Sequence, residues 1–154
     1  MINTNKVSEA DFRIQYFTIG ELLDRFRRFR EEQEQLNFFV ERNSGRQWSL
    51  NKQSLFIESI LCGIPVASLY IDGSNPIWNV IDGVERLNAI NKFVNNRLKL
   101  SEIELLSKDY SDLCFMDLPV YIQRRFLNTP LMVYILTTIL PREVKNIIFE
   151  RLNS

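Results

Sequence analysis

The sequence predicts a mixed α/β (α+β) domain in which a small, mostly antiparallel sheet is flanked by four to five helices. Short runs rich in β-branched and aromatic residues, which are typical of strands, alternate with longer stretches in which apolar residues recur at helical spacing. Clusters of Asp, Asn, Gly and Pro separate the two kinds of stretch. Apolar residues make up 45% of the 154 residues, as expected for one globular domain with a proper core.

Composition excludes several classes of site. The chain has no histidine, which rules out a Ser-His-Asp triad, a Cys-His pair, a His-ligated zinc ion and a His-Asn-His nuclease site. Its 19 basic and 19 acidic residues cancel, so contact with nucleic acid would require a local basic patch. The sequence shows no signal peptide and no apolar run of ~18 residues, so we expect a cytoplasmic protein in which Cys62 and Cys114 are reduced core residues.

We expect the chain to consist of a loosely held N-terminal segment, residues 1–17, and one domain, residues 18–154. Phe12, Ile14 and Tyr16 alternate with polar neighbours, and this alternation favours a short edge strand at the end of the segment.

A helix is predicted after Thr18, a good N-cap residue. This helix ends in a basic run interleaved with phenylalanine, residues 25–30. The run is either a solvated face, with Arg27 and Arg28 paired to the glutamates four positions later, or a surface that touches phosphates.

The next predicted elements are a strand over residues 36–40 and a polar loop over residues 41–47 that carries two arginines. The loop either faces a ligand or is an ordinary exposed loop. Trp48 is expected to pack at the start of the following helix, because a large ring in this place usually anchors the entry of the chain.

Ser49 or Asn51 is the predicted cap of that helix, which runs to about Cys62 and is ended by Gly63 in the C′ position. Glu58 is conspicuous within it and is expected either to be solvated or to pair with an arginine of the site. The predicted inward residues are Leu50, Ile57, Ile60 and Leu61.

Residues 67–71 and 77–81 are predicted strands that flank a turn and form an antiparallel hairpin. From Val84 the apolar spacing becomes helical. The remaining predictions are a short strand at 97–100, a helix from Pro119 to Leu127, a central strand at 131–139, and a last helix after Pro141 with Val144, Ile147, Ile148 and Leu152 inward.

The strand-to-helix junction carries the charged residues of most interest. Asp82 and Glu85 have the spacing of a capping box, in which Asp82 is the N-cap and Glu85 reaches back. Gly83 allows a sharp turn and exposes backbone N–H groups, which bind anions readily at a helix start. Arg86 opposes the helix dipole, so it must meet an anionic partner: either a carboxylate of the protein or a bound anion such as phosphate.

Four segments of the chain resemble one bacterial protein family. VIDGVERLNAI is similar to the Asp-Gly-Gln-Gln-Arg signature of the N-terminal domain family of GmrSD-type restriction endonucleases. LFIESILCGIPVASLYI, FMDLPVYIQRRFLNTPLMVYIL and the terminal IFERLNS also match in order and spacing, so the resemblance covers most of the chain from about Thr18. It implies a ParB/sulfiredoxin-like fold that binds or hydrolyses nucleoside triphosphates.

Two departures from the family bear on its implied activity. Val84 and Glu85 stand where the family has paired glutamines, and valine can neither hydrogen-bond a phosphate nor orient a water, so binding is favoured over hydrolysis. The upstream family segment is matched only loosely, by FFVERNSGRQW. The family segment corresponding to IFERLNS continues further, so we expect a longer protein or a trimmed C-terminus. Further pocket residues implied by the resemblance are Arg42, Arg46, Asn88, Glu150, Arg151 and Asn153.

Three functions follow from these observations. The first is a nucleotide-binding regulatory domain of a bacterial restriction or phage-defence protein, in which Asp82 holds Mg²⁺, Glu85 orients a water and Arg86 contacts phosphate. The second is a ParB-like module that binds DNA or a protein partner such as a nuclease subunit, with residues 25–30 and 123–125 as contacts. The third is a catalytically inactive interaction domain of the same fold.

Overall fold

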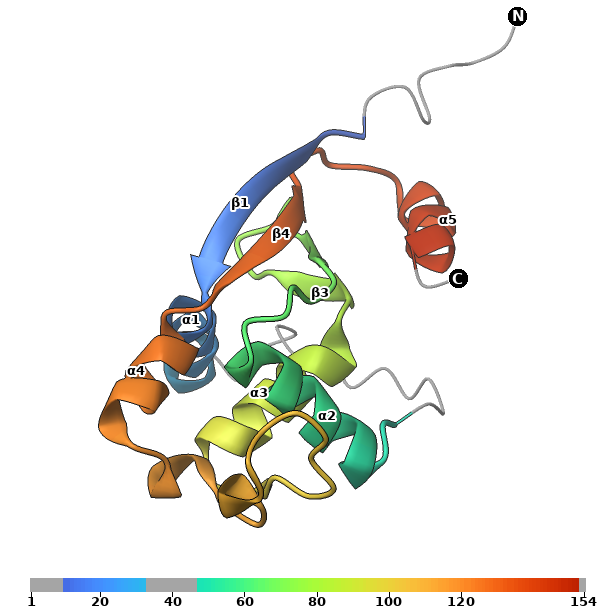
Figure 1. Ribbon diagram of the computed structural model, residues 1–154. Helices are drawn as coiled ribbons and strands as arrows, with labels where there is room; N and C mark the ends of the chain where they lie inside the picture. The colour runs from blue at the N-terminus through green and yellow to red at the C-terminus, as the bar shows by residue number, and fades with distance from the viewer. Residues whose placement is uncertain (1–9, 33–46, 153–154) are drawn as a thin grey trace, which may run out of the picture.

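The computed structural model describes residues 10–32 and 47–152 and contains, in these ranges, four strands and five α-helices (Figure 1). This confirms the predicted α/β class. In chain order the elements are β1 (Phe12–Thr18), α1 (Ile19–Glu32), α2 (Leu50–Leu61), β2 (Leu69–Asp72), β3 (Asn79–Asp82), α3 (Val84–Val94), α4 (Val120–Leu127), β4 (Pro130–Leu136) and α5 (Arg142–Leu152).

The sheet has the strand order β1-β4-β2-β3. β4 pairs antiparallel with β1 and parallel with β2, and β2 and β3 form an antiparallel hairpin. The predicted edge strand, hairpin and central strand are therefore confirmed, and the mixed sheet is mostly antiparallel. β4 ends at Leu136, three residues before its predicted end, and the strand Phe12–Thr18 places the start of the sheet inside the segment predicted to be loosely held.

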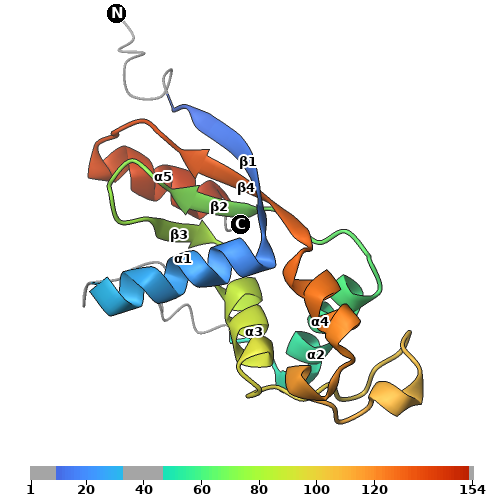
Figure 2. The ribbon, with the colours of Figure 1, turned by 90° about the vertical axis from the view of Figure 1, so that its left-hand side faces the viewer.

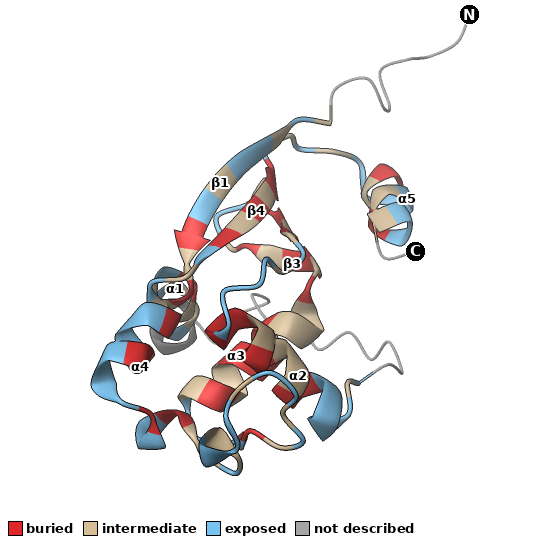
Figure 3. Ribbon diagram, in the orientation of Figure 1, coloured by how far each residue is buried: buried red, intermediate tan, exposed pale blue. Residues whose placement is uncertain are grey.

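The helices lie unequally on the two sides of the sheet. α1 to α4 gather on one side, whereas α5 is the one helix of the described ranges on the other side, where it packs against β3 (Figures 1 and 2). Buried residues are concentrated along α3 and the sheet interior (Figure 3). The main core joins alternate residues of the central strands, such as Leu69, Ile71 and Val133, to Leu87 and Phe93 of α3.

Several helix ends confirm the predicted caps. The N–H of Glu21 donates to Thr18 Oγ1 over 3.1 Å, and the N–H of Lys52 donates to Ser49 Oγ over the same distance. Gly63 takes the left-handed conformation after α2, with φ at 76°. Pro119 is the N-cap of α4.

Other predictions were wrong in detail. Residues 97–100 form no strand, although Leu100 exchanges backbone hydrogen bonds with Asp112 and Leu113. Leu50 is exposed because it lies in the first turn of α2, beyond the core. Ile147 is exposed because α5 meets the sheet only through a narrow side that includes Val144 and Phe149.

The two cysteines are free, as predicted, but Cys62 is exposed and Cys114 is half-buried, so neither is a core residue. The predicted strand at 36–40 and most of the 41–47 loop lie outside the described residues. None of the helices in the described ranges has the length and apolar character needed to cross a membrane.

Candidate functional site

The junction between β3 and α3 turns through Gly83. Its φ is 112°, a backbone conformation that residues with a Cβ rarely adopt, and it is the N-cap of α3 with no side-chain cap. The N–H of Leu87 donates to the Gly83 carbonyl over 3.0 Å and makes the first helical turn. The N–H groups of Val84, Glu85 and Arg86 lie ahead of this bond, as in the first turn of any α-helix.

The predicted capping box is not formed. Asp82 is the last residue of β3, and the left-handed turn at Gly83 moves the N-cap one residue along the chain. Glu85 does not reach back to Asp82. Its Oε2 instead accepts a hydrogen bond from the N–H of Trp48 over 3.3 Å. The first turn of α3 is thereby connected to the segment that enters α2.

Arg86 has its partners inside the protein. Nη1 donates to the carbonyl of Ala67 over 3.1 Å and to that of Ser68 over 2.6 Å, and Nη2 lies 3.4 Å from Asp82 Oδ2. The Arg86 side chain is 16% exposed. The structure thus supplies the first of the two alternatives, a carboxylate of the chain, and Arg86 ties the start of α3 to the chain leading into β2.

Trp48 and Gln53 extend this junction toward α2. The Trp48 ring packs edge to face on Phe56 with centroids 5.4 Å apart, as expected for an anchor, and Gln53 Nε2 donates to the Trp48 carbonyl over 3.0 Å. Gln53 is buried, and its Oε1 has no hydrogen-bond partner within the described residues. A buried acceptor without a hydrogen-bond partner is energetically costly.

The other predicted site residues are only partly brought together. Asn88 is half-buried in the second turn of α3, close to the junction, whereas Glu150 and Arg151 are exposed in the last turn of α5. α5 packs on β3, the strand that leads into the junction. Arg42, Arg46 and Asn153 lie outside the described residues.

Glu58 forms the most extensive carboxylate network in the described ranges, and both predictions for it were wrong. It is 2% exposed, and its oxygens accept hydrogen bonds from the N–H groups of Glu104, Leu105 and Leu106 over 2.8–3.1 Å. Burial raises the pKa of Glu58, but these three donors more than offset it, so the pKa lies below its ordinary value. Glu58 therefore fixes the long connection between α3 and α4.

A second buried carboxylate fastens α5. Asp72 is 4% exposed and accepts from the N–H and hydroxyl of Ser74, while Lys145 Nζ donates to its Oδ2 over 2.9 Å. Burial raises the pKa of Asp72, and the bonds from Ser74 and Lys145 outweigh this and lower it overall. The sequence placed Asp72 in a turn; nothing in the spacing pointed to a lysine 73 residues away.

Because the pKa values of Glu58 and Asp72 are lowered in the folded chain, we expect the free energy of unfolding to fall at acidic pH. Each holds its proton less readily in the folded than in the unfolded chain, so its stabilisation is complete above the ordinary pKa values of 4.5 and 3.8 and is lost as the pH falls below them. Urea unfolding should give a similar free energy at about pH 7 and pH 5.5, and a steep decline below about pH 4.5. A free energy that stays level down to about pH 3 would contradict these assignments.

Several of the side chains proposed to contact DNA make contacts within the fold. Arg25 lies over the Trp78 ring at 3.7 Å, and Arg27 and Arg28 both pair with Asp24. The side chains of the glutamates predicted as their partners lie outside the described residues. Gln123 Nε2 donates to the Leu118 carbonyl over 2.9 Å. Arg27 and Arg28 are exposed, which favours the predicted solvated face for these two residues, whereas Arg25 is half-buried against Trp78.

Within the ranges that the structure describes, no three Asp, Glu, Cys or His side chains group together as a metal site. No family model, curated protein or solved structure matches the chain. The residues of the junction are therefore the basis for assigning a function.

Proposed function

We propose that this chain is a nucleoside-triphosphate-binding regulatory domain of a bacterial restriction or phage-defence protein, acting in the cytoplasm. The observation that carries the proposal is the start of α3: Gly83 opens the helix in a left-handed turn with no side-chain cap. The first-turn N–H groups and the positive end of the helix dipole suit a phosphate group. The resemblance of residues 77–93 to a nucleotide-binding family supports the same site.

We assign different roles to the charged residues of the junction. Asp82 is partly exposed, at 24% for its side chain, and one or two carboxylates with phosphate oxygens are the usual ligands of Mg²⁺ in nucleotide sites. Bound Mg²⁺ would neutralise phosphate charge next to that carboxylate. Arg86 positions the turn by holding the carbonyls of Ala67 and Ser68. Arg42 and Arg46, in the preceding segment, remain the proposed phosphate-facing cations.

Binding is better supported than hydrolysis. Glu85, the residue proposed to orient a water, accepts the Trp48 N–H. Val84 offers no side-chain hydrogen-bonding group. Both residues stand where the resembling family has glutamine, so the positions that would act on a water molecule are occupied or apolar.

The test is thermal unfolding with Mg²⁺ and each of ATP, GTP, CTP and UTP. A nucleotide at ~100 times its dissociation constant adds ~2.7 kcal/mol, which raises Tm by several degrees in a chain of this size. Asp82→Asn should remove the Mg²⁺-dependent part of the shift, whereas Asp109→Asn, at an exposed position far from the junction, should keep all of it.

Failure would have a distinct meaning for each competing function. No shift with any nucleotide would reject the proposal and leave an interaction domain of the same fold. DNA affinity that falls steeply with salt, in the absence of a nucleotide shift, would favour the ParB-like module instead.

A further inference from the structure

A cavity of about 670 Å³ opens where the parallel strands β2 and β4 separate. The two strands pair from Leu69 and Val133 onward, and the cavity lies between the preceding segments, beside the ends of α2 and α4. Its size is within the range of ~300–1,000 Å³ that is typical of small-molecule sites. The apolar lining comprises Ile60, Leu61, Ile64, Pro65, Val66, Phe126, Leu131 and Met132.

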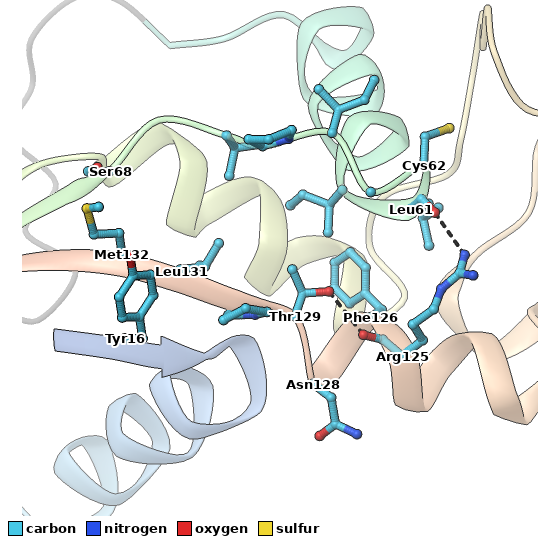
Figure 4. A pocket seen from close by; sticks show the side chains of 16 residues that line it. Tyr16, Leu61, Cys62, Ser68, Arg125, Phe126, Asn128, Thr129, Leu131 and Met132 are labelled. Atoms are coloured by element: carbon cyan, nitrogen blue, oxygen red, sulfur yellow. Dashed lines mark hydrogen bonds between the residues drawn. The ribbon is translucent and has the colours of Figure 1, made fainter.

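The cavity has a charged end and an apolar body. Figure 4 shows Arg125 and Cys62 at one end, Tyr16, Met132 and Ser68 at the other, and Phe126 and Leu131 between them. The aromatic side chains of Tyr16 and Phe126 contribute to the wall.

Arg125 has unused hydrogen-bonding capacity. Its Nη2 donates to the Leu61 carbonyl over 2.9 Å, which fixes the guanidinium at the cavity end. This is one of the five N–H donors of an arginine. Among the described residues Arg125 makes no ion pair, so its charge is available to an anionic ligand group.

The C-terminal ends of two helices repel an anion here, but more weakly than Arg125 attracts it. α2 and α4 both end at the cavity, and each C-terminus carries about half a negative charge spread over its last turn. Arg125 already covers one of those carbonyls, that of Leu61. A full positive charge in direct hydrogen-bonding reach outweighs partial charges that are further away and exposed to solvent.

We propose that this cavity binds a small monocarboxylic acid with an apolar or aromatic body, its carboxylate on Arg125 and its body along Phe126 and Leu131. The cavity adjoins the junction through Ser68 but is lined by none of the residues proposed to contact nucleotide, so each proposal can stand without the other. A carboxylate suits the flat, forked guanidinium, which can donate two parallel hydrogen bonds to it.

Calorimetric titration of the whole chain with 4-phenylbutyrate and with 4-phenylbutan-1-ol tests the proposal, because the two probes differ only in the head group. The acid should bind roughly tenfold more tightly than the alcohol, as expected for a charge-assisted pair. Arg125→Ala should abolish the difference and leave binding of the alcohol unchanged. Arg124→Ala, on the exposed neighbouring arginine of the same helix, should keep the full difference.

Arg125→Lys provides a second variant if the loss of the Leu61 contact unfolds Arg125→Ala; it should retain charge but lose most of the preference, since lysine lacks the fork. Val66→Phe should weaken both probes by filling the cavity. No heat with either probe, equal binding of acid and alcohol, or an unchanged preference in Arg125→Ala with native melting would each overturn the proposal.

Discussion

Replacing Glu58 with glutamine should lower the free energy of unfolding by about 2–3 kcal/mol, and replacing it with leucine by about 4–5 kcal/mol. Glutamine keeps one acceptor oxygen but replaces the other by an amide donor that faces the N–H of Glu104. Leucine accepts no hydrogen bond, so it leaves the buried N–H groups of Glu104, Leu105 and Leu106 unpaired.

Urea unfolding measures this loss, and amide hydrogen exchange locates it. Exchange at residues 104–106 should rise in both Glu58 variants before that of the sheet does, because Glu58 is the acceptor that holds them. Glu104→Gln is the matched control, since that side chain is exposed and the change should stay within about 0.5 kcal/mol. Equal stability of Glu58→Leu and the parent chain would show that the network contributes nothing.

Replacing Gly83 with alanine should lower the free energy of unfolding by about 3–4 kcal/mol and abolish the nucleotide binding that we propose for the junction. Two effects add. The φ of 112° disfavours any residue with a Cβ, and the new methyl group would overlap Leu69 Cδ2. Leu69 is 2% exposed in the core, so it can move aside only by disturbing its neighbours.

Gly63→Ala separates the two effects. Gly63 also has a positive φ, of 76°, but a Cβ there would meet no atom within 4 Å. Gly63→Ala should therefore lower the free energy of unfolding only by the backbone penalty, about 1–2 kcal/mol. Chemical unfolding of both variants gives the comparison, and a Gly83→Ala protein no less stable than Gly63→Ala would contradict the close packing of the turn against Leu69.

Features governed by local rules were predictable. The hairpin followed from two apolar runs around Asp72, Gly73 and Pro76, and the start of α4 followed from Pro119. The helix start after Gly83 was also predicted, but the cap was placed one residue early, because Asp82 and Glu85 have the spacing of a capping box whether or not the strand continues through Asp82.

Features that depend on distant partners were not predictable. Arg86 drew attention as a cation in a first helical turn, but its carbonyl partners at Ala67 and Ser68 were predicted to belong to a strand, and they lie just before β2. Glu58 stood out as a charge in an apolar helix, and its donors lie 46–48 residues away in an irregular segment. A short motif can therefore single out a charged residue, but it does not identify the distant backbone groups that form its hydrogen bonds.

The position of β1 constrains the order in which the chain can fold. Among the described strands β1 pairs only with β4. Asp11 and Thr138, joined by a hydrogen bond at the end of that ladder, are 127 residues apart. The β2–β3 hairpin, by contrast, closes across a short turn. Closing so large a loop is slow, so the hairpin should form early and β1 last. During synthesis the N-terminal strand must wait, unpaired, until the ribosome has released β4.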